Sequence, residues 1–173
     1  MKKKLIKLVT VLCLAALIFT TATPVRAETT MYTSTQVFMD YLDMKGVKYR
    51  YMGVDGRDET VSVIYSLDNF DSLKCNLYFQ DDDEVDLRIY DIVTVSGGTD
   101  HALSVINALN SEYKFAKFVL NPDDRTIQAE QDMLIDPETC GKVVYQAMIM
   151  LFLVIDDEDV SSRLHNLEYS IGV

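Results

Sequence analysis

Between residues 47 and 89, apolar and polar side chains alternate in four consecutive segments, and a turn signal separates each segment from the next. Every second side chain of a strand points to the same face of a sheet, so this alternation predicts four strands. The strands are expected at 47–51, 61–65, 73–79 and 85–89, with turns at 55–56, 68–69 and 81–84. Strands joined by such short turns pair with their neighbours, which predicts a four-stranded antiparallel meander.

The rest of the chain supplies helices and one hairpin. Apolar residues at helical spacing predict helices that begin near Thr33, near Ala102 and after Asp136-Pro137. Two further strands are expected at 115–120 and 126–135, and a final helical turn or two beyond residue 160. The predicted fold class is therefore α+β, a single domain with the order helix, four-stranded antiparallel meander, helix, β-hairpin and helix.

The first 27 residues have the layout of a secretory signal peptide. Four lysines precede an apolar run from Leu8 to Phe19, and Val25-Arg26-Ala27 closes the segment. The apolar run is shorter than the about 20 residues that a membrane-spanning helix needs. We expect cleavage after Ala27 and export of residues 28–173 as a secreted, cell-surface or periplasmic domain with its core at about 34–160. The alternative is a leader retained as a membrane anchor.

Removal of the leader makes the charge more negative. The leader holds five of the 16 basic residues and no acidic residue, so residues 28–173 have 11 basic and 27 acidic residues, a net charge of −16. Such a field repels nucleic acid and anionic lipid headgroups. We therefore expect no nucleic-acid partner, and no membrane association after cleavage.

Two cysteines, Cys75 and Cys140, remain after the leader. In an oxidising compartment an even number of cysteines suggests a disulfide. Each cysteine also falls on the core-facing side of its predicted element, where a buried thiol packs as a small hydrophobic group. One disulfide and two buried thiols are the alternatives that the sequence leaves open.

The residues for common catalytic and metal sites are scattered. Only His101 and His165 can act as imidazole bases, and no Gly-x-Ser-x-Gly stretch accompanies them. The acidic clusters at 81–84 and 156–159 do not match a calcium-binding EF-hand loop and are expected to be solvated turns. We expect no enzyme, cofactor or metal site. A small-ligand or calcium-binding extracellular module is the alternative, and a hydrolase is the third.

The last predicted long helix has nine apolar residues in succession, from Ala147 to Ile155. A helix that is apolar on all sides is buried on more than one side. Either other elements of the chain cover it, or part of it faces a second subunit. The residues expected at such a homodimer interface are Met148, Met150, Leu151 and Phe152.

One stretch resembles a known family. A helix ends in two asparagines and leads into a basic-aromatic strand, with the pattern Asn107-x-x-Asn110-x-x-Tyr-Lys-Phe. The turn at 122–124, the strand at 128–132 and the helix that begins at Cys140-Gly141 follow. Over roughly residues 34–160 this arrangement is similar to the YbjN domain family, described as bacterial sensory transduction regulators with a fold like that of type III secretion chaperones.

The resemblance implies a small, often dimeric, non-enzymatic domain that works through protein contacts, and it supplies no catalytic residues. Members of the family are commonly cytoplasmic, whereas the leader of this chain indicates export, so a cytoplasmic regulatory role does not transfer. We therefore expect an exported, non-catalytic protein-binding, chaperone-like or regulatory domain whose partner is unknown.

Asn107 and Asn110 also have a physical interpretation of their own. At the last turn of a helix, asparagine side chains bond to backbone groups that lack partners. We expect both residues to form a structural junction that fixes how this helix meets the next strand. Ligand binding by the two asparagines is the alternative.

Overall fold

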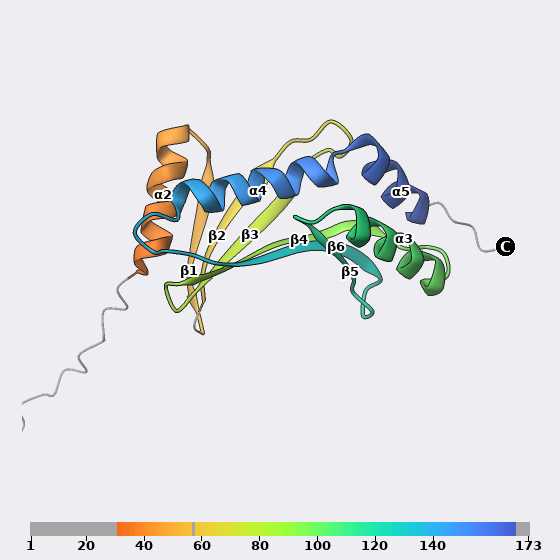
Figure 1. The fold of residues 1–173 in the computed structure, drawn as a ribbon, viewed down its shortest axis with the longest axis horizontal. Helices are drawn as coiled ribbons and strands as arrows, with labels where there is room; N and C mark the ends of the chain where they lie inside the picture. Colours follow the sequence, from red (N-terminus) through yellow and green to blue (C-terminus); the bar gives the residue numbers. More distant parts are fainter. Residues whose placement is uncertain (1–30, 57, 169–173) are drawn as a thin grey trace, which may run out of the picture. The chain divides into compact units, whose positions relative to one another are not determined.

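The computed structural model describes residues 31–56 and 58–168, and the signal peptide expected at 1–27 lies outside these residues. Within them, four helices and six strands follow one another along the chain (Figure 1). The elements are α2 (Thr33–Lys45), β1 (Tyr49–Asp55), β2 (Asp58–Tyr65), β3 (Leu73–Gln80), β4 (Glu84–Thr94), α3 (Thr99–Glu112), β5 (Lys117–Leu120), β6 (Thr126–Leu134), α4 (Gly141–Ile155) and α5 (Glu158–Glu168). The predicted α+β class is confirmed.

The six strands form one antiparallel sheet with the order β1-β2-β3-β4-β6-β5. The first four strands pair consecutively, as expected for a meander. The hairpin then folds back so that β6 pairs with β4 and β5 becomes the outer strand. The register shifts in two places, between Tyr51 and Gly53 in β1 and between Ile89 and Val93 in β4.

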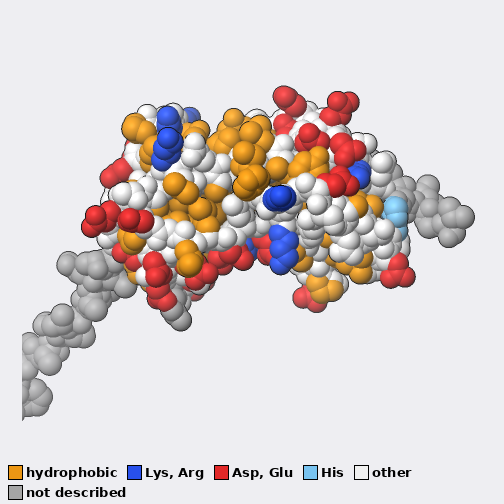
Figure 2. All heavy atoms as spheres, in the orientation of Figure 1, with side chains coloured by type: hydrophobic (Ala, Val, Ile, Leu, Met, Phe, Trp, Pro, Cys, Tyr) orange, Lys and Arg blue, Asp and Glu red, His pale blue; other side chains and the backbone are white. Residues whose placement is uncertain are grey.

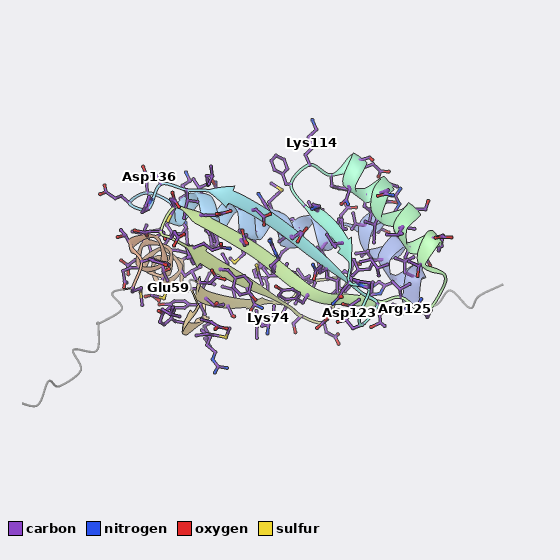
Figure 3. All side chains as sticks on the ribbon, turned by 90° about the horizontal axis from the view of Figure 1, so that it is seen from below. Glu59, Lys74, Lys114, Asp123, Arg125 and Asp136 are labelled. Atoms are coloured by element: carbon purple, nitrogen blue, oxygen red, sulfur yellow. The ribbon has the colours of Figure 1, made fainter. Side chains whose placement is uncertain are left out.

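The alternation along the strands separates the two faces of the sheet. One face carries the buried apolar side chains, among them Val61, Leu77 and Leu87, and the helices pack against it. Figure 3, seen from below, shows the sheet in front and α4 behind it. The largest buried side chains include Phe38, Phe79, Phe118 and Phe152. The other face carries mostly polar side chains.

Helix α4 lies close to α2 because a glycine stands at the contact. A Cβ atom added to Gly141 would lie 2.8 Å from the carbonyl oxygen of Val37 and 2.9 Å from Cβ of Tyr41. Real Cβ contacts are essentially never this short. The absence of a side chain at the first residue of α4 therefore sets how closely the two helices approach.

Two helix boundaries differ from the expectation. Helix α4 begins at Gly141 rather than just after Asp136, because residues 137–140 form a turn in which the Asp136 carboxylate accepts a bond from the Glu138 amide (3.0 Å). The expected helical turn or two beyond residue 160 is part of an 11-residue helix, α5. Its buried residues Val160, Leu164 and Leu167 pack into the core.

Candidate functional site

The four residues expected at an interface lie on different sides of α4. Met148, Leu151 and Phe152 are at most 1 % exposed and belong to the core, whereas Met150 is 40 % exposed. The interface prediction was wrong for the three core residues, because an unbroken apolar run gives no sign of which side of a helix faces the sheet. The exposed apolar side chains of α4 are Val143, Met150 and Leu153.

We call the outward side of α4 the α4 face and define it by Val143, Gln146, Ala147, Met150 and Leu153. Gln146 is exposed and Ala147 half-buried, and the spacing of all five places them along one side of the helix. Helix α4 contains no Asp or Glu and only one charged residue, Lys142. Figure 2 shows hydrophobic side chains gathered over α4, with acidic side chains mostly to either side.

A shallow groove adjoins the α4 face on the side of α2. It has a volume of about 310 Å³, and its lining includes Val37, Tyr41, Met44 and Lys142. Met44 is 65 % exposed. Val37, Tyr41 and Met44 extend the apolar surface of the α4 face into this groove, which Asp40 and Glu138 also line.

The two cysteines are free and buried. The disulfide alternative is therefore corrected in favour of two thiols. Burial raises the pKa of the Cys75 thiol to about 12 and that of the Cys140 thiol to about 11. Cys140 Sγ lies 3.5 Å from the carbonyl oxygen of Ser34 in α2. Since the thiolate is the reactive form, both groups act as packing residues rather than as nucleophiles.

The two asparagines have different environments. The Asn110 amide pairs with both backbone groups of Phe118 in β5, because Asn110 Oδ1 accepts from the Phe118 amide (2.7 Å) and Asn110 Nδ2 donates to the Phe118 carbonyl (2.9 Å). Asn110 thus lies at the junction between α3 and the outer edge of the sheet. The Asn107 side chain is exposed and makes no hydrogen bond with a described residue, while its backbone carbonyl accepts from Ser111 Oγ.

The acidic clusters bond to backbone amides. Asp82 accepts from the Ser34 amide (2.7 Å) in the first turn of α2. Asp156 accepts from the amides of Asp68 (3.0 Å) and Asn69 (2.8 Å). Asp157 accepts from the amides of Asp159 and Val160 and so caps α5. Residues 31–56 and 58–168 contain no group of three or more His, Cys, Asp or Glu side chains placed to hold a metal ion.

The histidines lie apart from one another. His101 is exposed at the start of α3. His165 in α5 lies between two acceptors, the Asn69 carbonyl at 3.0 Å from Nε2 and the Glu168 carboxylate at 3.1 Å from Nδ1. Its ring also stacks on Phe70, with the centroids 4.7 Å apart. His165 therefore fixes the turn between β2 and β3 against α5.

This arrangement predicts a pH dependence of stability. The Asn69 carbonyl, and then the Glu168 carboxylate, raise the pKa of His165 above its ordinary value of 6.5, since a protonated ring can donate to both. The stabilisation is complete below pH 6.5 and is lost as the pH rises through the higher pKa of the folded state. The urea midpoint of the wild type should fall more between pH 6 and 8 than that of His165→Gln, and parallel curves would contradict this role.

The polar face of the sheet carries a row of side chains that crosses all six strands. Successive register pairs connect these residues, which are Arg50, Ser62, Asn76, Arg88, Glu130 and Lys117. Ser62 Oγ donates to Asn76 Oδ1 at 2.7 Å. Glu130 forms ion pairs with Arg88 (3.5 Å) and Lys117 (3.1 Å). On the β4–β6–β5 side of the sheet, the cations of this row are therefore neutralised.

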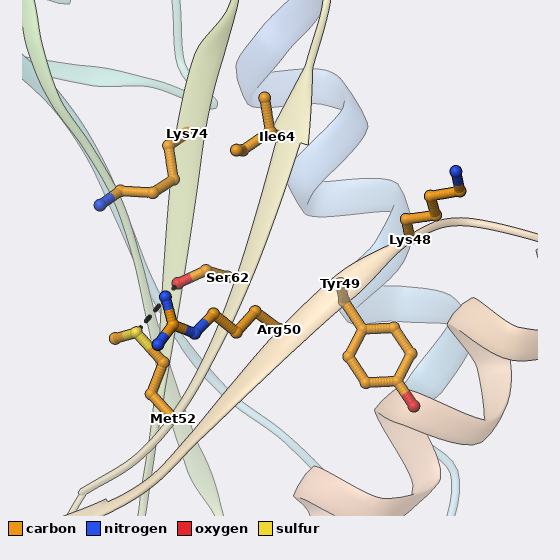
Figure 4. Close-up of a pocket in the computed structure, with 7 residues that line it drawn as sticks. All are labelled: Lys48, Tyr49, Arg50, Met52, Ser62, Ile64 and Lys74. Carbon is orange, nitrogen blue, oxygen red and sulfur yellow. Dashed lines mark hydrogen bonds between the residues drawn. The ribbon is translucent and has the colours of Figure 1, made fainter.

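On the β1–β3 side, by contrast, three cations form no ion pair with any described residue. These are Lys48, Arg50 and Lys74. They line a pocket of about 450 Å³ together with Tyr49, Met52, Ser62 and Ile64. In Figure 4, Arg50 reaches across β2 toward Ser62 and Lys74 projects from β3, while Lys48 and Tyr49 point away from them.

This pocket is not recognisable from the sequence alone. Its residues come from β1, β2, β3 and Lys48 just before β1. In the sequence, the basic residues look like ordinary solvent-facing residues of alternating strands. The strand register is what brings these residues together, because it places Ile64 beside Lys74 and Arg50 beside Ser62.

No protein-family model matches the chain, and no curated protein matches it significantly. The resemblance to the YbjN domain family therefore stays a prediction. None of the helices in the described residues has both the length and the hydrophobicity that crossing a membrane requires.

Proposed function

We propose that this chain is an exported, non-catalytic domain that works by binding protein, and that the α4 face binds a second copy of the chain. The observation that carries the proposal is an exposed apolar helix side without a carboxylate, in a domain whose expected net charge is −16. Two acidic copies repel each other over most of their surface. Contact through the α4 face brings no carboxylate of that helix toward the second copy.

Charge complementarity supports an antiparallel pairing of the two α4 helices. A twofold axis near residue 148 would place Val143 against the partner's Leu153 and Gln146 against the partner's Met150. The single cation of α4, Lys142, would then lie near the acidic segment 156–159 of the second copy. Stable interfaces bury about 800 Å² on each partner, so the groove with Met44 would contribute to the contact.

The family resemblance and the positions of the titratable groups support a role without catalysis. His165 engages both ring nitrogens in contacts that hold a turn, and burial raises the pKa of both thiols. The YbjN domain family provides a precedent for a small, often dimeric domain that acts through protein contacts. Export, expected from the leader, separates this proposal from a cytoplasmic regulatory role.

Light scattering coupled to size-exclusion chromatography tests the proposal. The wild type should be a dimer at micromolar concentration, and Leu153→Asp should be a monomer with an unchanged circular dichroism spectrum, because the substitution places two carboxylates in an apolar contact. Leu134→Asp is the matched control, since Leu134 is 82 % exposed but lies at the end of β6. A monomeric wild type, or dissociation by Leu134→Asp as well, would overturn the pairing through α4.

A further inference from the structure

The pocket on the polar face of β1–β3 combines unpaired cations with apolar surface. Arg50 and Lys74 carry charges that no described residue neutralises, although the chain has 27 acidic residues. Ile64 is 67 % exposed and Met52 52 % exposed, and both line the same pocket. The volume of about 450 Å³ lies within the range of small-molecule sites.

We propose that this pocket binds an amphipathic organic anion, an aliphatic chain that ends in a carboxylate. The carboxylate would lie between the guanidinium of Arg50 and the ammonium of Lys74. The aliphatic chain would lie on Ile64, Met52 and the methylene stems of the two basic side chains. This site is separate from the α4 face, because it lies on the opposite side of the sheet.

The residue types fit both ends of such a ligand. A guanidinium presents a planar pair of donors that matches a carboxylate, and a neighbouring ammonium adds a second charge-assisted bond. The stems of arginine and lysine cover apolar surface while their charged heads stay in water. Ile64 lies directly beside Lys74 in the β2–β3 register, so an apolar contact and a cation come from adjacent positions.

Ser62 lies in the polar floor of the pocket, and its hydroxyl group already has a partner. Ser62 is buried and donates to the buried Asn76, so its hydroxyl hydrogen is already used. Ser62 Oγ also lies 3.8 Å from Met52 Sδ (Figure 4). Ser62 therefore offers no hydroxyl donor while it keeps the Asn76 bond, and recognition of the anion falls to Arg50 and Lys74.

Isothermal titration calorimetry with decanoate, kept below its critical micelle concentration, tests the site. We expect saturable binding of one decanoate per chain. Acetate supplies the same headgroup without the chain, and decyltrimethylammonium supplies the same chain with the opposite charge. Both should bind at least tenfold more weakly.

Single substitutions locate the binding. Arg50→Gln and Lys74→Gln should each weaken decanoate binding about tenfold, the loss expected for one charge-assisted bond. Ile64→Ser should also weaken it. Lys114→Gln is the matched control, because Lys114 is an exposed lysine of the α3–β5 connection, distant from Lys74 in Figure 3. The circular dichroism spectra of all variants should match that of the wild type, since the altered side chains are exposed.

The proposal is overturned if decanoate shows no saturable binding, if decyltrimethylammonium binds as tightly, or if Lys114→Gln weakens binding as much as Lys74→Gln. The Leu153→Asp variant separates this site from the α4 face. Unchanged decanoate affinity in that variant supports the pocket, and lost affinity would assign the ligand to the α4 face instead.

Discussion

Gly141→Ala should lower the free energy of unfolding by about 3 kcal/mol, the upper part of the range for overpacked contacts. The added Cβ would lie 2.8 Å from the Val37 carbonyl oxygen, a backbone atom, so relief requires that α2 and α4 move apart. Alanine is otherwise the better helix former by up to about 1 kcal/mol. The loss therefore reports the steric contact and not helix propensity, and urea denaturation followed at 222 nm measures it.

Gly98→Ala is the matched control for this substitution. Gly98 precedes α3 with a φ of −69°, and a Cβ there would meet no atom within 4 Å. Alanine is only a poorer N-cap residue than glycine, so the loss should stay below about 1 kcal/mol. Equal losses at the two positions would show that the α2–α4 contact tolerates a methyl group. The contact matters for the proposed function because the groove beside the α4 face lies between these helices.

Asn110→Ala should cost about 2 kcal/mol of unfolding free energy. The substitution removes both bonds to Phe118 and leaves its amide and carbonyl without their side-chain partners at the end of the sheet. Asn110→Asp should also be destabilising, because one carboxylate oxygen still accepts from the Phe118 amide but the other repels the Phe118 carbonyl oxygen. Urea denaturation measures the loss, and hydrogen exchange should show faster exchange of the Phe118 amide.

Asn107→Ala provides the internal comparison. Asn107 is the other asparagine of the pair. Its side chain is exposed and, unlike that of Asn110, makes no hydrogen bond with a described residue. Its substitution should change stability by less than about 0.5 kcal/mol. If both asparagines cost the same, the bonds to Phe118 do not explain the role of Asn110.

These residues also show how far the sequence predicts the structure. The strands of the meander are visible because alternate residues such as Val61 and Val63 follow a period of two. Helix α5 is longer than expected. Val160, Leu164 and Leu167 have helical spacing, but the acidic segment before them resembles a solvent-exposed turn after the last helix. In fact Asp157 of that segment caps α5.

The parts of the candidate sites that escaped prediction depend on contacts between distant residues. The amide of Asn110 could be placed at a helix end, but its partner Phe118 required the positions of α3 and β5. The apolar run from Ala147 to Ile155 indicates that the helix is buried but not which side of it faces the sheet. Met150 and Leu151 therefore look alike in the sequence, although Met150 is exposed and Leu151 is buried. The basic pocket required the register of three strands.

The two edges of the sheet are protected in different ways, and this bears on how the protein behaves at high concentration. Among the described residues, no strand lies beyond β1 or β5. At β5 the Asn110 amide occupies the bonding groups that an added strand would use at Phe118. At β1 a register shift and the flanking charges of Lys48 and Arg50 disfavour regular pairing. The sheet therefore resists edge-to-edge polymerisation at high concentration, and the proposed pairing through the α4 face would leave both edges uncovered.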